Sequence, residues 1–204
     1  MIRSRQDLRL YLEADRISMC RGKFGLSSFL FDRVWKWERL LRKVEYYENR
    51  GGGLVFKLVK WFHWIRLLRM RVGVEIFTNC VGPGLCLVHG GPVFINKRAR
   101  IGRNAVIHPM VVIGQGRSED DVPTIGNNVH IGPGAKIIGS VVIGDNVVIA
   151  ANAVVTRSFP EGNCTIGGIP AKRISDHISI RPYENGGDPL VRMAWEEAVA
   201  RLKG

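Results

Sequence analysis

The sequence predicts a parallel β-helix that follows an α-helical N-terminal region. Aliphatic residues recur at every sixth position from Ile95 to Val155, and the phase survives one twelve-residue gap. Small residues such as Ala99 and Ala105 follow four positions after each aliphatic residue. A period of six is neither the period of about 3.6 of an amphipathic helix nor the period of two of an ordinary strand, and it is typical of a β-helix. Residues 5–70 instead carry apolar residues at helical spacing.

Three segments follow from this pattern: a helical segment over residues 1–73, the β-helix over residues 74–179, and a tail over residues 180–204 with a short helix near its end. In the first segment we expect helices over 5–18, 28–49 and 54–70. Three consecutive glycines at 51–53 end the second helix, because glycine is costly in a helix interior.

The third expected helix mixes cations with aromatic residues, among them Lys57, Lys60, Trp61 and Trp64. Such a helix could lie on an anionic membrane surface. It could also be a bundle helix whose aromatic side chains are covered by the two other helices. We favour the bundle, because those two helices are available.

The charge balance is strongly basic, with a net charge of +12. Residues 1–75 hold 17 Lys and Arg against 8 Asp and Glu. Nucleic acid, an anionic membrane and a phosphorylated ligand remain open as partners on charge alone. The sequence has no apolar run long enough for a membrane span and no secretory leader pattern. Its four cysteines are scattered without Cys-x-x-Cys spacing, so we expect a reducing, cytoplasmic location.

One insertion interrupts the repeat. The row GQGRSEDDVPT over residues 114–124 is polar and flanked by glycine, which predicts a projecting loop. Insertions in repeat proteins commonly mark the functional side. We therefore expect the acceptor side of any active site to involve this loop.

Residues 84–173 resemble the hexapeptide acyltransferases, and the serine O-acetyltransferase branch is the most similar. The motifs that carry the resemblance are GLCLVHGG, IGRNAVIHPMVVIGQG, VVIGDNVVIAANAVV and IGGIPAKRI. The resemblance implies a left-handed β-helix, a trimer or dimer of trimers, acetyl-CoA as the donor, and active sites between neighbouring subunits. It implies no nucleic-acid partner and no metal.

In this family a histidine acts as general base on the acceptor hydroxyl, and His89 is the matching residue. An imidazole that titrates near neutral pH can take the hydroxyl proton as the new bond forms. His89 could alternatively fill an inward slot of the helix, since it falls on the six-residue phase. His108, at an expected corner, could line the same cleft, and His130 is expected at an outward rim. A metal site built from the three histidines is disfavoured, because the sequence lacks a closely spaced pair.

Two departures concern the acceptor. Val88 replaces the acidic residue that precedes the family's catalytic histidine, and Asp121 and Val122 replace a basic pair that would hold a serine carboxylate. A carboxylate repels another carboxylate. We therefore expect Asp120 and Asp121 in an acceptor site for a neutral or amine-bearing alcohol, with Glu75 as a further acidic member.

The resemblance also implies the donor site, in which backbone groups of two coils meet the pantetheine arm and cations meet the phosphates. Pro133 lacks an N–H and can offer only a carbonyl at this point. The matching positions are Gly132, Gly134, Ala135, Ala150, Ala151, Thr156, Arg157, Lys172 and Arg173.

These observations favour an acetyl-CoA-dependent O-acetyltransferase acting on a sugar hydroxyl in capsule or O-antigen assembly. The sugar could be free or carried on a lipid at the inner face of the membrane. The alternatives are a serine O-acetyltransferase of cysteine biosynthesis and a non-catalytic β-helix scaffold subunit.

Overall fold

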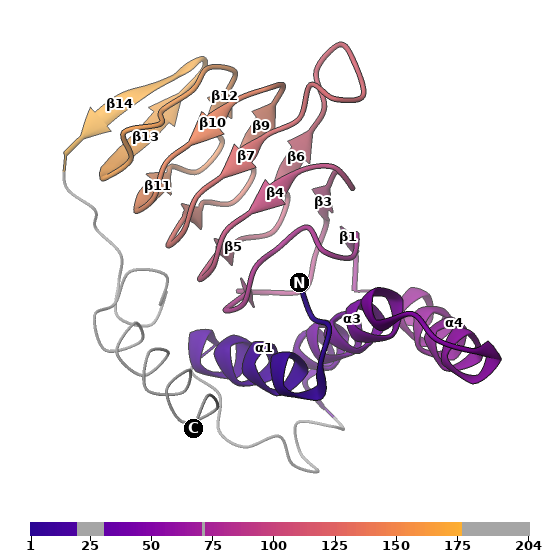
Figure 1. The fold of residues 1–204 in the computed structure, drawn as a ribbon. Helices are drawn as coiled ribbons and strands as arrows, with labels where there is room; N and C mark the ends of the chain where they lie inside the picture. Colours follow the sequence, from indigo (N-terminus) through magenta and orange to yellow (C-terminus); the bar gives the residue numbers. More distant parts are fainter. Residues whose placement is uncertain (20–30, 71, 177–204) are drawn as a thin grey trace.

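The computed structural model describes residues 1–19, 31–70 and 72–176 (Figure 1). Cys20 and the helix expected near residues 194–202 lie outside this part of the chain. The three expected N-terminal helices are confirmed as α1 (Arg5–Ser18), α3 (Arg33–Arg50) and α4 (Leu54–Arg69). None of the described helices is both long enough and apolar enough to cross a bilayer.

The helix ends follow from local chemistry. Ser4 and Asp7 form a reciprocal capping box at the start of α1, with Asp7 N–H donating to Ser4 Oγ at 3.0 Å. Asp32 caps α3 by accepting from Trp35 N–H at 2.9 Å. At its other end α3 stops at Gly51, whose φ of +64° is a conformation that glycine adopts without strain.

The β region is a left-handed parallel β-helix whose strands form three faces. One face holds β1-β3-β6-β9-β12, the second β10-β7-β4, and the third β14-β13-β11-β8-β5-β2. All pairs are parallel except β13 with β14, which closes the C-terminal end of the third face. The strands are β1 (Val74–Ile76), β2 (Cys86–Leu87), β3 (Val93–Ile95), β4 (Arg100–Ile101), β5 (Val106–Ile107), β6 (Val112–Gly114), β7 (Thr124–Ile125), β8 (His130–Ile131), β9 (Lys136–Ile138), β10 (Val142–Ile143), β11 (Val147–Ile149), β12 (Val154–Val155), β13 (Cys164–Gly168) and β14 (Ala171–Ser175).

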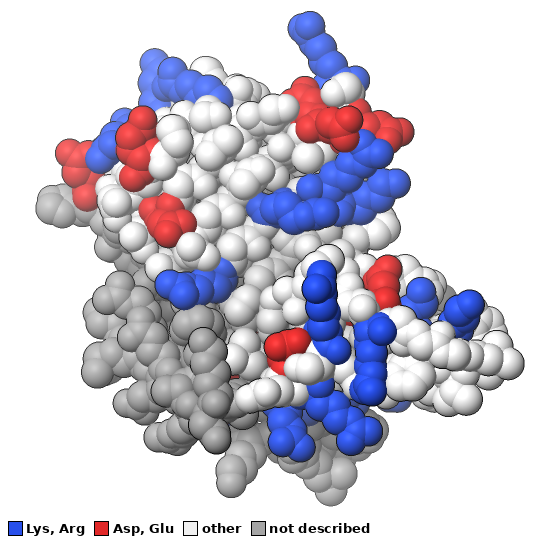
Figure 2. All heavy atoms as spheres, viewed as in Figure 1, with Lys and Arg blue, Asp and Glu red and all other residues white. Residues whose placement is uncertain are grey.

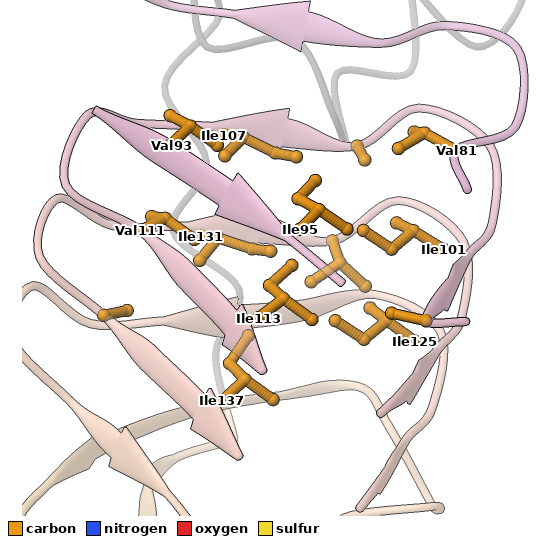
Figure 3. Close-up of a cluster of buried hydrophobic side chains, with 14 of the residues drawn as sticks. Val81, Val93, Ile95, Ile101, Ile107, Val111, Ile113, Ile125, Ile131 and Ile137 are labelled. Atoms are coloured by element: carbon orange, nitrogen blue, oxygen red, sulfur yellow. The ribbon is translucent and has the colours of Figure 1, made fainter. Parts of the chain in front are cut away.

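The six-residue repeat places equivalent aliphatic side chains on top of each other inside the coils (Figure 3). On the first face Ile95 pairs with Ile113, and Ile113 pairs with Ile137, and all three are fully buried. Burial of one such side chain contributes about 1.5–3 kcal/mol. The repeat therefore specifies both the strand register and the core.

A column of asparagines follows one corner of the coils. Asn104, Asn128, Asn146 and Asn163 all have positive φ, and each amide donates to the next one at 2.9–3.0 Å. Asparagine tolerates this left-handed conformation better than other side chains. The column joins four successive coils by side-chain hydrogen bonds.

The helices cover the N-terminal end of the β-helix, below the first coil in Figure 1. A buried ion cluster makes the connection. Arg42 of α3 donates to Asp15 of α1 at 2.8 Å, to Glu45 at 3.0 Å, and to the carbonyls of Val81 and Gly82 at 2.9 and 2.7 Å. Asp15 also accepts the N–H groups of residues 84 and 85. At this cluster the helices cover the edge of the first coil and protect it from pairing with another chain.

Helix α4 is covered less than we expected. Leu67 is buried and Trp64 packs against the core, as a bundle helix requires. Trp61 and Phe62, however, are 63% and 56% exposed, so the expectation that the aromatic side chains are core is wrong for these two. The available helices reach only one side of α4.

Candidate active site

His89 lies in a bend directly after β2 and is exposed. Its expected alternative, an inward slot, is wrong because the first coil is longer than the regular ones. Leu87 pairs with Ile107, twenty residues later, whereas paired residues of β8 and β11 are eighteen apart. The two additional residues shift the phase and turn the imidazole to the surface.

Two backbone hydrogen bonds hold the bend. Val88 N–H donates to the carbonyl of Ile107 at 3.2 Å, and Gly91 N–H donates to the carbonyl of Val72 at 3.0 Å. Gly91 has a φ of +153°, a conformation that suits glycine. At Gly73, the carbonyl carbon of Gly91 would lie only 2.9 Å from an added Cβ. Glycines thus allow the segment before β1 and the His89 bend to approach closely.

Glu38 of α3 is a member of this site that sequence reasoning missed. Its Oε1 accepts the Leu87 N–H at 2.9 Å, two residues before His89. The carboxyl is fully buried, and burial, together with Asp15, raises its pKa well above the ordinary value. The available signal was an acid spaced four residues before Arg42, among the apolar residues of a predicted helix.

His89 shares one edge of the β-helix with part of the predicted donor site. This edge, called the His89 edge, comprises residues 88–91, 108–110, 132–134 and 150–152, which follow β2, β5, β8 and β11. The first residues of the four corners align through consecutive coils, because each donates its N–H to the coil above at 2.8–3.2 Å. The sequence separates these corners by up to 64 positions, and the fold brings them into one row.

On this edge the two predicted pantetheine segments lie against each other. Gly132 N–H donates to the carbonyl of Ile149 at 2.8 Å, and an added Cβ on Gly132 would lie 2.7 Å from the nitrogen of Ala151. Ala151 is exposed, and its N–H has no acceptor among the described residues. The Ala151 N–H and the backbone around Pro133 are the groups of this edge that suit the amides of a pantetheine arm. The Pro133 carbonyl already accepts from Asn152 N–H at 2.9 Å.

Ala135 does not fit the donor role that we expected. Its side chain is fully buried in the core. Its N–H donates to Gly132 and its carbonyl accepts from Val112. Ala135 is an inward small residue of the repeat, so it has no group to offer at the surface.

The predicted phosphate-binding cations come together at the C-terminal end. Arg157 donates to the carbonyl of Ala171 at 3.1 Å, which brings it beside the exposed Lys172 and Arg173 of β14. Arg173 is paired with Asp176 at 2.6 Å. Thr156 is exposed next to Arg157. Clustered cations of this kind suit phosphate groups.

His108 lies one coil beyond the His89 bend and His130 lies two coils beyond it, and the two rings contact each other with centroids 4.9 Å apart. His130 is 8% exposed, so our expectation of an outward rim position is wrong. The pairing was hidden in the sequence because the two residues are 22 positions apart. In the described part of the chain no three His, Cys, Asp or Glu side chains gather as metal ligands.

The inserted loop projects as expected, at the top of Figure 1 between β6 and β7. Asp121 closes it: Oδ1 accepts from the Ser140 hydroxyl at 2.6 Å and Oδ2 from Arg117 N–H at 3.0 Å. The Ser140 and Arg117 contacts lower the pKa of Asp121. Asp120 and Glu119 pair with Arg98 at 2.5 and 2.6 Å.

The loop and His89 occupy different corners of one chain. The loop joins the first face to the second, whereas the His89 edge joins the third face to the first. Glu75 lies in the edge strand β1 and lines a largely apolar cavity of about 490 Å³ with Trp37, Trp64 and Phe77. Glu75 lies two residues after Gly73, which approaches Gly91 of the His89 bend, whereas Asp120 and Asp121 lie in the loop at the other corner.

Comparison with known proteins gives concordant results. Residues 123–157 match the family model described as bacterial transferase hexapeptide (six repeats). A serine acetyltransferase of Helicobacter pylori is 34% identical over 148 residues, which cover 65% of this chain and 82% of the relative. A serine acetyltransferase of Synechococcus elongatus is 39% identical over 141 residues, or 67% of this chain. The chain spans 54% of the length of that second relative.

A solved structure of serine acetyltransferase from Brucella abortus in complex with coenzyme A has the same fold. It aligns with a TM-score of 0.64 and 26% identity, over 83% of this chain and 67% of that one. The similarity extends beyond the β-helix, since residues 74–176 alone are too few to make up that share of the chain.

Proposed function

The chain belongs to the hexapeptide-repeat transferase family, and on this premise we propose that it is an acetyl-CoA-dependent O-acetyltransferase with His89 as the general base. One observation carries the proposal: an exposed histidine shares an edge of the β-helix with two backbone segments that suit the donor's pantetheine arm. The Brucella relative with coenzyme A bound supports the donor.

The reaction is a direct transfer. His89 takes the proton of the acceptor hydroxyl while the hydroxyl oxygen attacks the thioester carbonyl carbon. The new C–O bond forms, the C–S bond breaks, and the proton passes from His89 to the departing thiolate. Proton transfer by such a base contributes about 10²–10⁴-fold to the rate.

L-Serine is the acceptor that the relatives support, because both carry the name serine acetyltransferase. This acceptor was our alternative in the sequence, and it now stands ahead of a sugar. Glu75 is our candidate for meeting the amino group, because it is exposed and follows by two residues Gly73, which approaches Gly91 in the His89 bend. The arrangement also requires a cation for the serine carboxylate.

A sugar hydroxyl remains a second candidate because of the inserted loop. Its residues 119–121 are all acidic, and Arg98 already pairs with two of them. An acidic loop opposes the binding of a free carboxylate. Should this loop reach the His89 edge of a neighbouring subunit in a trimer, it would favour a neutral acceptor.

The test measures thiol release from acetyl-CoA with L-serine and, separately, with nucleotide-linked sugars. We expect His89→Ala to lower kcat/KM by about 10²–10⁴-fold. His63→Ala, which changes a histidine of α4 stacked on Tyr47, is the matched control and should retain activity. Undiminished transfer by His89→Ala would refute the base assignment. Absence of transfer to every acceptor would favour the scaffold alternative, and turnover of a sugar alone would exclude serine.

A further inference from the structure

Helix α4 presents an apolar face that no other described element covers. Of its described side chains only Leu67 is buried. The exposed members, called the α4 face, are 55–72% exposed and comprise Leu54, Val55, Leu58, Trp61, Phe62 and Leu68. Single exposed apolar residues are ordinary on protein surfaces, but a continuous group of this size marks an interaction surface.

The face is continuous because its members recur at helical spacing. Leu58, Trp61, Phe62 and Leu68 lie at positions i, i+3, i+4 and i+10, which project from one side of a helix. Leu67 and Trp64 point to the opposite side and pack against the β-helix end. Figure 1 shows α4 extending outward from the body, and Figure 2 shows mainly uncharged surface on this part of the molecule.

Cations surround this face and acids are missing from the helix. Lys57 and Arg66 are exposed, and the Arg66 guanidinium lies 5.5 Å from the ring centroid of Phe62. The α4 sequence LVFKLVKWFHWIRLLR contains no Asp or Glu. Large apolar side chains bordered by Lys and Arg suit the interface of an anionic membrane, where apolar groups meet the acyl chains and cations meet the lipid phosphates.

We propose that α4 binds in the plane of an anionic lipid bilayer, with the α4 face toward the acyl chains and Lys57 and Arg66 at the lipid phosphates. With 16 residues the helix is shorter than the roughly 20 needed to span a bilayer core. A second copy of the chain in a two-fold contact is a poorer occupant. In a two-fold contact the same face meets itself, so cations would meet cations without an acid from either helix.

The test is co-sedimentation of the full-length protein with vesicles of phosphatidylcholine alone or mixed with phosphatidylglycerol. We expect binding to the mixed vesicles only, without competition from inorganic phosphate. Trp61→Ala with Phe62→Ala should lower the partition coefficient at least about tenfold. Lys57→Glu should lower it by about fivefold or more, which corresponds to the loss of one cation near the surface.

Matched controls come from the β-helix. Val142→Ala changes an exposed aliphatic residue of β10, and Lys97→Glu reverses an exposed lysine in a turn. Both should bind vesicles like the unmodified protein, and circular dichroism should show that all four variants are folded. Equal losses for Lys57→Glu and Lys97→Glu would overturn the assignment to α4. So would absent vesicle binding together with a lower molecular mass of the Trp61 and Phe62 variant in light scattering, which would identify a second copy as the occupant.

Discussion

The coils and the helical cap of this protein are stabilised in opposite ways. In the coils, apolar residues such as Ile113 and Ile137 occupy the same inward position in successive coils. Each packs against the equivalent residues of the neighbouring coils. The cap is joined to the first coil through ionisable groups, among which Arg42, Asp15 and Glu38 have almost no exposed surface. Each of these groups has a role that no other residue duplicates.

This difference determines how local a perturbation is. In a solenoid the stability is approximately a sum over neighbouring repeats, so one weakened slot costs little. A buried ion cluster is different, because removal of one partner leaves the others charged and unpaired. The His89 bend depends on both regions: the carbonyl of Ile107 in the coils accepts from Val88 N–H, and Glu38 of the cap accepts from Leu87 N–H.

Replacement of Arg42 should have the largest effect. Arg42→Ala leaves Asp15 and Glu45 without their cation and two carbonyls without a donor. We expect a loss of about 3–5 kcal/mol in the free energy of unfolding, measured by urea denaturation. Arg9→Ala, at an exposed position of α1, should change it by less than about 0.5 kcal/mol. Similar losses for the two variants would contradict the importance given to the cluster.

In the coils, the asparagine column should be the most sensitive to substitution, because it consists of polar groups that depend on one another, as in the cap. Asn128→Ala removes hydrogen bonds to Asn104 and Asn146 and puts alanine at a φ of +54°. We expect a loss of about 2–3 kcal/mol from the broken bonds and the left-handed backbone. Asn128→Gly removes the same bonds but tolerates the backbone, so its loss should be smaller by about 1 kcal/mol. If glycine were as harmful as alanine in thermal unfolding, backbone strain would have no part in the effect.

The inward positions of the regular coils should show the smallest losses in the free energy of unfolding. Ile113→Val and Ile137→Val each remove one buried methyl group at equivalent positions of adjacent coils. Each should cost about 1 kcal/mol, and the two losses should be nearly equal in urea denaturation. A difference much larger than that between the two slots would show that the coils are not equivalent.

Sequence periodicity predicted what depends on repetition. The strands, the inward isoleucines and the projecting loop all follow from the period of six and its one interruption. Periodicity failed where the burial of a side chain depends on contacts with residues that are distant in the sequence. His130 was expected at a rim and is buried, Ala135 was expected at a ligand and faces the core, and Trp61 was expected in a core and is exposed.

The candidate active site shows the same division. His89 was predicted through its motif, but its exposure depends on two additional residues in the first coil, which the six-residue phase does not register. Asp121 was expected to face an acceptor, whereas its carboxylate closes the loop on Ser140 and Arg117. Glu38 was missed because an acid on a helix is usually solvated, and only the packing of α3 on β2 reveals its burial.

The pH dependence of stability tests whether Glu38 is neutral in the folded cap. Burial, aided by Asp15, raises the pKa of Glu38 above its ordinary value, although the Leu87 N–H and Arg42 oppose the shift. No described residue forms a hydrogen bond with its Oε2, which is tolerable for a neutral carboxyl and costly for a charged one. A raised pKa in the folded state means that this contribution to stability is complete below the ordinary pKa. It is lost as the pH rises toward the folded value.

Glu38→Gln keeps the size of the neutral side chain and its acceptor for the Leu87 N–H, but it cannot ionise. We expect the variant to match the unmodified protein in thermal unfolding at acidic pH and to become the more stable of the two as the pH is raised. Glu48→Gln, at an exposed position of the same helix, is the matched control and should leave the pH profile unchanged. If Glu38→Gln were instead destabilising at every pH, the charged carboxylate would be required beside Arg42. The cap would then depend on an ionised Glu38 as it does on Asp15.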